Sequence, residues 1–131
     1  MALIEDGVYA YLSSQVNITT LVGDRIYPSL LPQVPTLPAI VFFNMGSIPV
    51  RKINGAPDLV STEFQFHCFA TDLREAKLIS KALRGSLESY VGLMGDSTVR
   101  AVLCSTEGME DYDDVPNDFR VVSEYEIWHL L

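Results

Sequence analysis

The chain has 131 residues, of which 48% are hydrophobic, and its formal net charge at pH 7 is −8. This length fits one α+β domain over residues 1–131, and the pattern indicates neither secretion nor membrane spanning. An acidic chain repels nucleic-acid phosphates, which argues against a duplex-binding protein of the usual basic kind.

The N-terminal third of the chain begins with helical signals and ends in prolines. Apolar spacing predicts a first helix over Ala2–Ser13, and Ile18–Val22 can add one more helical turn. Asp24–Tyr27 is a short extended piece. Four prolines between Pro28 and Pro38 predict a stiff connector. Their PxxP spacing is compatible with an SH3-like partner, but the composition favours a structural crossover.

A buried strand and a hairpin follow this connector. Ala39–Asn44 is apolar on both sides, as a strand in the middle of a sheet would be. Met45–Asp58 contains the strong turn signal Asn54-Gly55, so we predict a hairpin arm that projects beyond the sheet. Such an arm can reach a neighbouring chain or be an ordinary surface loop. Its tip carries Arg51, Lys52 and Ile53.

The central strand and helix organise the prediction. Alternation over Leu59–Ala70 places Phe64 and Phe66 on an apolar face and Glu63 and His67 on a polar one. Asp72 then starts a predicted helix that extends to Gly92, in which Gly85 is either an early end or a site of close packing. The apolar stripe that packs on the strand is formed by Ala76, Ile79, Leu83, Leu87 and Tyr90.

Two more strands, Thr98–Cys104 and Asp118–Leu130, end the chain and are most simply antiparallel neighbours. The link Gly92–Ser97 is rich in turn residues, and the acidic run Glu107–Asp118 is expected to connect the two strands as a loop. These elements predict an α+β fold. It has a mostly antiparallel sheet of four to five strands, two main helices packed on one face, and the projecting hairpin arm.

No motif for chemistry stands out. His67 and His129 fall on predicted strands, where a solvated or interface histidine is favoured over a catalytic one. Cys68 and Cys104 lack metal-ligand spacing and are expected to stay reduced. The run Glu110–Asp114 lacks the glycine and distal glutamate of a calcium loop, so a solvated acidic turn is favoured. We therefore predict no enzyme, no metal and no cofactor.

Three stretches resemble a known family. LVGDRIYPSLLPQVPTLPAIVF (Leu21–Phe42), FQFHCFATDLREAKLISKALRGSL (Phe64–Leu87) and FRVVSEYEIWH (Phe119–His129) resemble the tail-completion, or tail-terminator, proteins of long-tailed bacteriophages and their prophages. The most specific part of this resemblance is the motif GDRIYP, which is followed by a proline-rich segment and then by AIV. The resemblance covers most of the chain in the same order.

The resemblance implies a structural protein that assembles in the host cytoplasm and ends up at the top of the virion tail tube. Its implied partners are further copies of itself in a ring, commonly of six subunits, the tail tube protein and a head–tail connector or stopper protein. DNA passes through the bore without specific binding, and no membrane is involved. Two alternatives remain: another connector or a tube protein, and a monomeric ligand-binding or enzymatic α+β domain.

A ring requires two different surfaces on each subunit. Opposite charges on the predicted arm and acidic loop are compatible with one such contact, and an acidic surface facing the bore would let DNA slide. The interface candidates are therefore Arg51, Lys52, Ile53, Asp111, Asp113 and Asp114.

Overall fold

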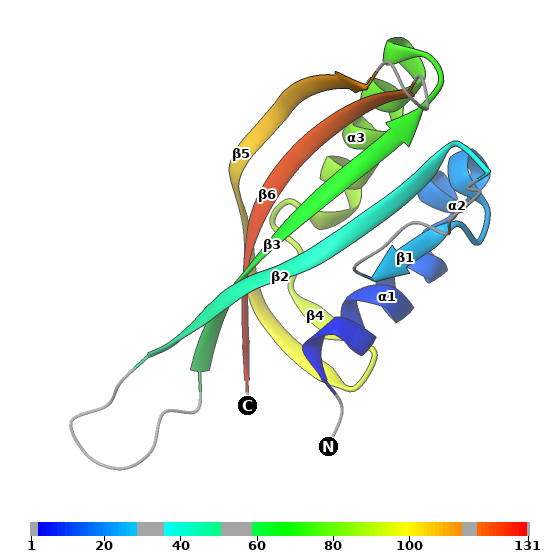
Figure 1. The fold of residues 1–131 in the computed structure, drawn as a ribbon. Helices are drawn as coiled ribbons and strands as arrows, with labels where there is room; N and C mark the ends of the chain where they lie inside the picture. The colour runs from blue at the N-terminus through cyan, green and yellow to red at the C-terminus, as the bar shows by residue number, and fades with distance from the viewer. Residues whose placement is uncertain (1–2, 29–35, 51–58, 114–117, 131) are drawn as a thin grey trace.

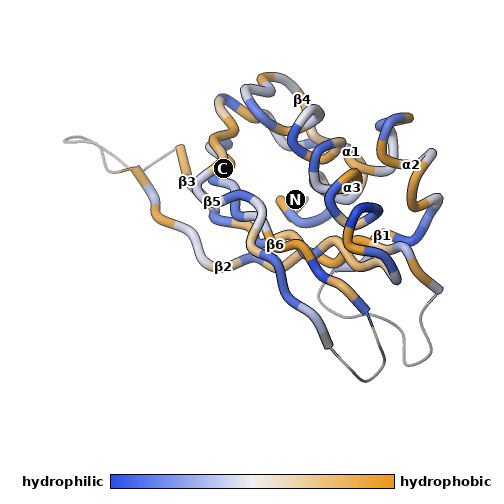
Figure 2. The backbone as a smooth tube through the Cα atoms, turned by 90° about the horizontal axis from the view of Figure 1, so that it is seen from above, coloured by the Kyte–Doolittle hydropathy of each residue, from blue (hydrophilic) through white to orange (hydrophobic). Residues whose placement is uncertain are grey.

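The computed structural model describes residues 3–28, 36–50, 59–113 and 118–130. Within these ranges, three helices lie on one face of a single six-stranded sheet (Figures 1 and 2). The helices are α1 (Ile4–Ser14), α2 (Val16–Val22) and α3 (Leu73–Leu87). The strands are β1 (Ile26–Pro28), β2 (Ala39–Val50), β3 (Leu59–Ala70), β4 (Gly92–Met94), β5 (Ser97–Asp113) and β6 (Asp118–Leu130), in the sheet order β1-β2-β3-β6-β5-β4.

The sheet is larger than the four to five strands predicted; it is mixed, but four of its five described strand pairs are antiparallel, in agreement with a mostly antiparallel sheet. Strand β1 pairs in parallel with β2, with Ile26 opposite Ile40. Strand β4 forms from Gly92–Met94, where a turn-rich link was expected, and pairs with the start of β5. Three-residue edge strands are too short to show a period of two, which is why the sequence did not reveal this pairing. The remaining neighbours are antiparallel, as predicted.

The sheet is strongly curled into a half-barrel, and helix α1 contacts both of its edge strands, β1 and β4 (Figure 1). Gly7 makes the contact with β4 possible, because a Cβ at this position would lie 2.4 Å from the Met94 carbonyl oxygen. The helices therefore fill the concave side of the sheet. The convex side carries no helix in the described part of the chain.

The core lies between the concave face of the sheet and the helices. Phe64, Phe66 and Cys68 of β3 are fully buried, as the alternation predicted. Tyr125 of β6 meets Phe66 edge to face, with ring centroids 5.6 Å apart. Each large side chain buried here contributes roughly 1.5–3 kcal/mol. The α3 residues that complete this core are Ile79, Leu83 and Leu87.

Helix α3 begins as predicted but ends earlier. The Asp72 carboxylate accepts a hydrogen bond of 3.3 Å from the Arg74 backbone N–H and so caps the first turn. The helix ends at Leu87, before the predicted Gly92, because Ser89 adopts a positive φ and donates its N–H to the Val102 carbonyl. Gly85 neither ends the helix nor packs closely, since a Cβ there would meet open space.

The predicted hairpin is observed as far as its tip, whereas the predicted acidic loop needs correction. The legs of the arm are the outer halves of β2 and β3, which stay paired to Val50 and Leu59, while its tip at 51–58 lies outside the described residues. The prediction that the acidic run is a loop from Glu107 onward is wrong, because β5 continues to Asp113. Bulges near Thr106 let this strand bend while it keeps pairing with β6.

We predict opposite effects for alanine at two helical glycines. Gly85→Ala should raise the free energy of unfolding by about 0.5–1 kcal/mol, because the new methyl meets no atom and the unfolded chain loses freedom. Gly7→Ala should lower it, because its Cβ collides with the β4 backbone. Urea unfolding of both variants measures this, and a stabilised Gly7→Ala would contradict the contact between α1 and β4.

Candidate functional site

His129 is hydrogen-bonded to a buried hydroxyl rather than being the solvated or interface residue that was predicted. Its Nε2 lies 2.7 Å from the Thr62 hydroxyl, which in turn lies 2.8 Å from the Ser47 hydroxyl, so three neighbouring strands are joined. Thr62 is fully buried and His129 is only 7% exposed. A substrate cannot reach this hydroxyl, so the pair has a structural role.

His67 lies on the convex face, half-buried between Phe43 and Phe69. Its Nε2 is 2.7 Å from the Gln65 side-chain oxygen. Burial, with a smaller effect of the Arg120 charge, lowers the pKa of His67, so the ring stays neutral at pH 7. No nucleophilic side chain is among the polar partners described for this ring.

The two cysteines are free, as expected. Burial raises the pKa of the Cys68 thiol to about 12, and burial also raises that of Cys104. Thiols with raised pKa values are poor nucleophiles.

Neither a metal cluster nor a membrane-spanning helix is found in the described ranges. No group of three His, Cys, Asp or Glu side chains there could hold a metal ion. None of the described helices combines the length and the apolar character needed to cross a bilayer.

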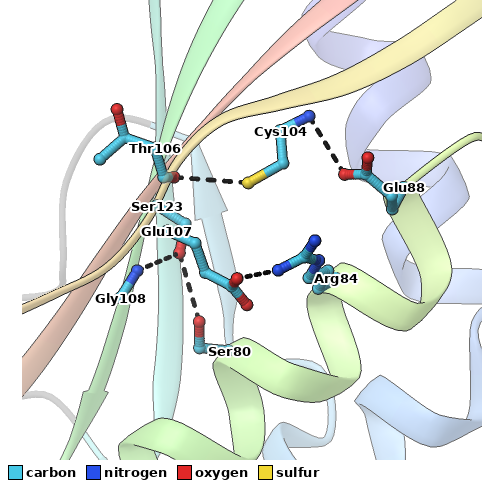
Figure 3. Close-up of polar contacts among 8 residues, drawn as sticks. All are labelled: Ser80, Arg84, Glu88, Cys104, Thr106, Glu107, Gly108 and Ser123. Carbon is cyan, nitrogen blue, oxygen red and sulfur yellow. Dashed lines mark hydrogen bonds and ion pairs between the residues drawn. The ribbon is translucent and has the colours of Figure 1, made fainter.

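The acidic part of β5 is largely neutralised within the subunit. Glu107 pairs with Arg84 of α3 (Figure 3), and Glu110 pairs with Lys77 of the same helix at 2.8 Å. Asp111 pairs with the Arg120 guanidinium, which together with the Tyr112 backbone N–H holds the Asp111 pKa below its ordinary value. Acidic residues can therefore continue the strand, because cations from α3 and β6 face them.

The outward edge of β5 is covered by the end of α3 (Figure 3). The Cys104 backbone N–H donates to the Glu88 carboxylate at 3.1 Å, and the Val102 carbonyl accepts from the Ser89 N–H at 3.0 Å. Further along the strand, the Tyr112 N–H donates to the side chain of Asp111 at 2.9 Å. These backbone groups are thus bonded within the subunit and are less open to a partner strand.

The outer half of β2 is an edge of a different kind. Strand β1 covers β2 only from Ile40 to Phe42. Beyond it, a bulge lies between Asn44 and Gly46, and the Asn44 side chain accepts from the Gly46 N–H at 2.8 Å. Pro49 has no N–H to donate. Bulges and prolines are devices that discourage strand addition, so this edge is also blunted.

A groove beside this edge lies on the convex face. We call it the β2 groove; its volume is about 210 Å³, and Met45 and Ile48, which are 53% and 74% exposed, form its apolar rim. Glu63 and Glu126 stand directly opposite each other across β3 and β6. Like charges in this position destabilise a sheet. The remaining lining residues are Gly46, Ser47 and Ser61.

The predicted interface residues are only partly placed. Asp111 is exposed on β5 and is already paired with Arg120. Asp113 is in β5, but its side chain is not among those described, and Arg51, Lys52, Ile53 and Asp114 lie outside the described residues. A contact between arm and acidic stretch stays a prediction. The sequence analysis did not predict the β2 groove. The alternation showed the polar face of β3, but it could not show that Glu63 lies opposite Glu126 on the neighbouring strand.

Comparison with known proteins connects this geometry to one family. The family model described as "Tail completion protein gp17" matches residues 6–130. The fold matches a chain of the "Virion of native gene transfer agent (GTA) particle" with a TM-score of 0.77 and 14% identity, covering 95% of this chain and 92% of that one. A second solved structure, known only by a sequence identifier, has a TM-score of 0.58 and 13% identity and covers 96% of both chains. No curated protein sequence matches significantly.

The ion pair of Asp111 predicts a pH dependence. Its folded pKa lies below the ordinary value of 3.8, so the pair adds stability above that pH and the contribution is lost as the pH falls through the folded pKa. Asp111→Asn should therefore be less stable than the parent chain at about pH 6, and this difference should shrink below pH 3.8. Thermal unfolding of both chains across this range tests it, and a difference independent of pH would contradict the ion pair.

The carboxylates in the β2 groove give a prediction of the opposite sign. Glu126→Gln should raise the free energy of unfolding at pH 7 by about 0.2–1 kcal/mol, because it removes a like charge from opposite Glu63. The gain should decrease in about 1 M salt. Glu124→Gln is the matched control, since Glu124 accepts from the Gln65 amide and should give no gain. Denaturant titrations compare the two.

Proposed function

Because the chain belongs to the tail completion protein gp17 family, we propose that it forms a ring that caps a phage tail tube. As a tail completion protein it is a structural, non-enzymatic component of a phage-like virion. The proposed ring is a homo-oligomer of about six subunits. It ends tube polymerisation and offers the surface to which the head joins.

The observation that carries the proposal is the extent of the family match, which runs from residue 6 to residue 130. It includes the helices, the sheet and the acidic stretch. The fold shared with a chain of a gene transfer agent virion supports the same assignment, since that chain is itself part of a virion.

The proposed partners follow from this position. One face of the ring contacts the tail tube protein, and the other contacts a connector or stopper protein. The chain assembles in the host cytoplasm and remains at the top of the tail. DNA passes through the bore without specific binding, and a net charge of −8 is compatible with that passage because the protein does not attract phosphates.

The ring also agrees with the sheet edges. A closed ring uses two different surfaces of each subunit. Since the β5 edge is bonded to α3 and the β2 edge is interrupted by a bulge and Pro49, side chains rather than a shared backbone ladder are expected to make most of the contact.

The alternatives make different demands. A tube protein would polymerise beyond one ring, and a stopper would bind a connector rather than a tube end. A monomeric binding domain needs an enclosed pocket with convergent polar groups. The hollow beside α1 and β1, about 380 Å³ in volume, is an open surface depression and does not favour that interpretation.

Mass measurement tests the proposal. We expect light scattering over a concentration series, with negative-stain images, to show a ring of about six subunits, either free or after purified tail tubes are added. Rings seen only at tube ends also agree. Tubes growing from the chain alone would indicate a tube protein, and a monomer that ignores tube ends would contradict the proposal.

A further inference from the structure

Helix α3 presents an exposed surface along its outer side. Arg74, Leu78, Lys81 and Gly85 follow one another at spacings of four, three and four residues, so they lie along one side of the helix, and all four are exposed. We call them the outer stripe. The buried residues of α3 occupy the opposite side, so Arg74, Leu78 and Gly85 point away from the sheet. Lys81 stands at the border of this surface, since it also lines the hollow between α3 and β5.

The outer stripe combines charge with exposed apolar surface. Leu78 is 44% exposed between two cations. Lys77 and Arg84, on the flank of the helix, pair with β5, whereas no ion pair described for this chain includes Arg74 or Lys81. Gly85 leaves the helix surface open, because a Cβ added there would have no atom of another element within 4 Å. Glycine destabilises a helix, and Gly85 has no packing role inside the subunit. Its small size lets another subunit approach the helix closely at this position.

The β2 groove has the complementary character. Its lining is apolar at the exposed Met45 and Ile48 and acidic at the opposed residues Glu63 and Glu126. Ser105 donates a hydrogen bond to Glu63 at 3.3 Å, but no ion pair described for this chain includes either carboxylate. A cation on an aliphatic stem fits such a groove, since the stem can lie on the rim while the charge meets the acids.

We propose that the outer stripe of one copy docks into the β2 groove of the next copy, with Arg74 and Lys81 facing Glu63 and Glu126 and Leu78 facing Met45 and Ile48. This inference rests on the proposed ring and names its two surfaces. Helix α3, which carries the stripe, lies on the concave side of the sheet (Figure 1), whereas the residues that line the groove belong to β2, β3 and β6 and face the convex side. Two different surfaces on opposite sides of a subunit give the head-to-tail contact that a closed ring needs.

A pair of reversed variants tests the docking. The stripe variant Arg74→Glu with Lys81→Glu carries acids on both surfaces, and the groove variant Glu63→Lys with Glu126→Lys carries bases on both. Each alone should need a concentration at least about tenfold higher than the parent chain to assemble. An equimolar mixture should regain assembly, because stripe and groove variants can alternate around the ring. Light scattering, with tail tubes added if the parent chain needs them, is the readout.

The outcomes separate the docking from the ring. Recovery in the mixture supports the docking and shows that both variants fold. Normal assembly of either variant alone, or failure of the mixture, overturns the docking and leaves the ring in place. Failure of the parent chain with and without tubes overturns the ring itself. Arg100→Glu, at an exposed base on β5 outside both surfaces, is the charge control and should assemble normally.

Discussion

The contact of one helix with both edges of the sheet is the constraint on which the rest of this structure depends. Helix α1 can touch β1 and β4 together only if the sheet between them curls, and Gly7 allows the close approach to β4. Curling places the helices and the core on the concave side. In the described part of the chain it also leaves the convex side of β2, β3 and β6 without a helical layer, so this side is where polar strand residues and the β2 groove are found.

The ion pairs with helix α3 decide which acidic residues of the chain keep an unpaired charge, and their clustering in the sequence does not. The acidic residues clustered near the C-terminus look like a solvated loop, yet two of them lie beside cations of α3 and continue strand β5. The charges that none of the described ion pairs includes lie elsewhere, and among them are two cations on the outer side of α3 and two carboxylates across β3 and β6. The net charge of the chain therefore says little about which surface attracts a partner.

Local patterns were sufficient to predict the centre of the fold. The alternation in β3 and the stripe in α3 are each a direct consequence of burial on one face, so Phe64, Phe66, Ile79 and Leu83 were placed correctly. The pairing of β1 with β2, the length of β5 and the role of His129 depend on residues far apart in the chain. The candidate site was predicted less well, because Glu63 and Glu126 become neighbours only through the register of two strands, and four of the six candidates lie outside the described residues.

The blunted edges of β2 and β5 also bear on how this fold can diversify. Hydrogen bonds between the backbones of two edge strands do not depend on the side chains. Subunits joined by such bonds would therefore also bind the subunits of any relative that shares the fold. Side chains on the surface can change without disturbing the buried positions, and the fold is indeed shared with a virion chain at 14% identity. In the proposed ring, where Asn44, Pro49 and Glu88 restrict the backbone groups, the choice of partner would lie with surface charges, which two related particles can change independently.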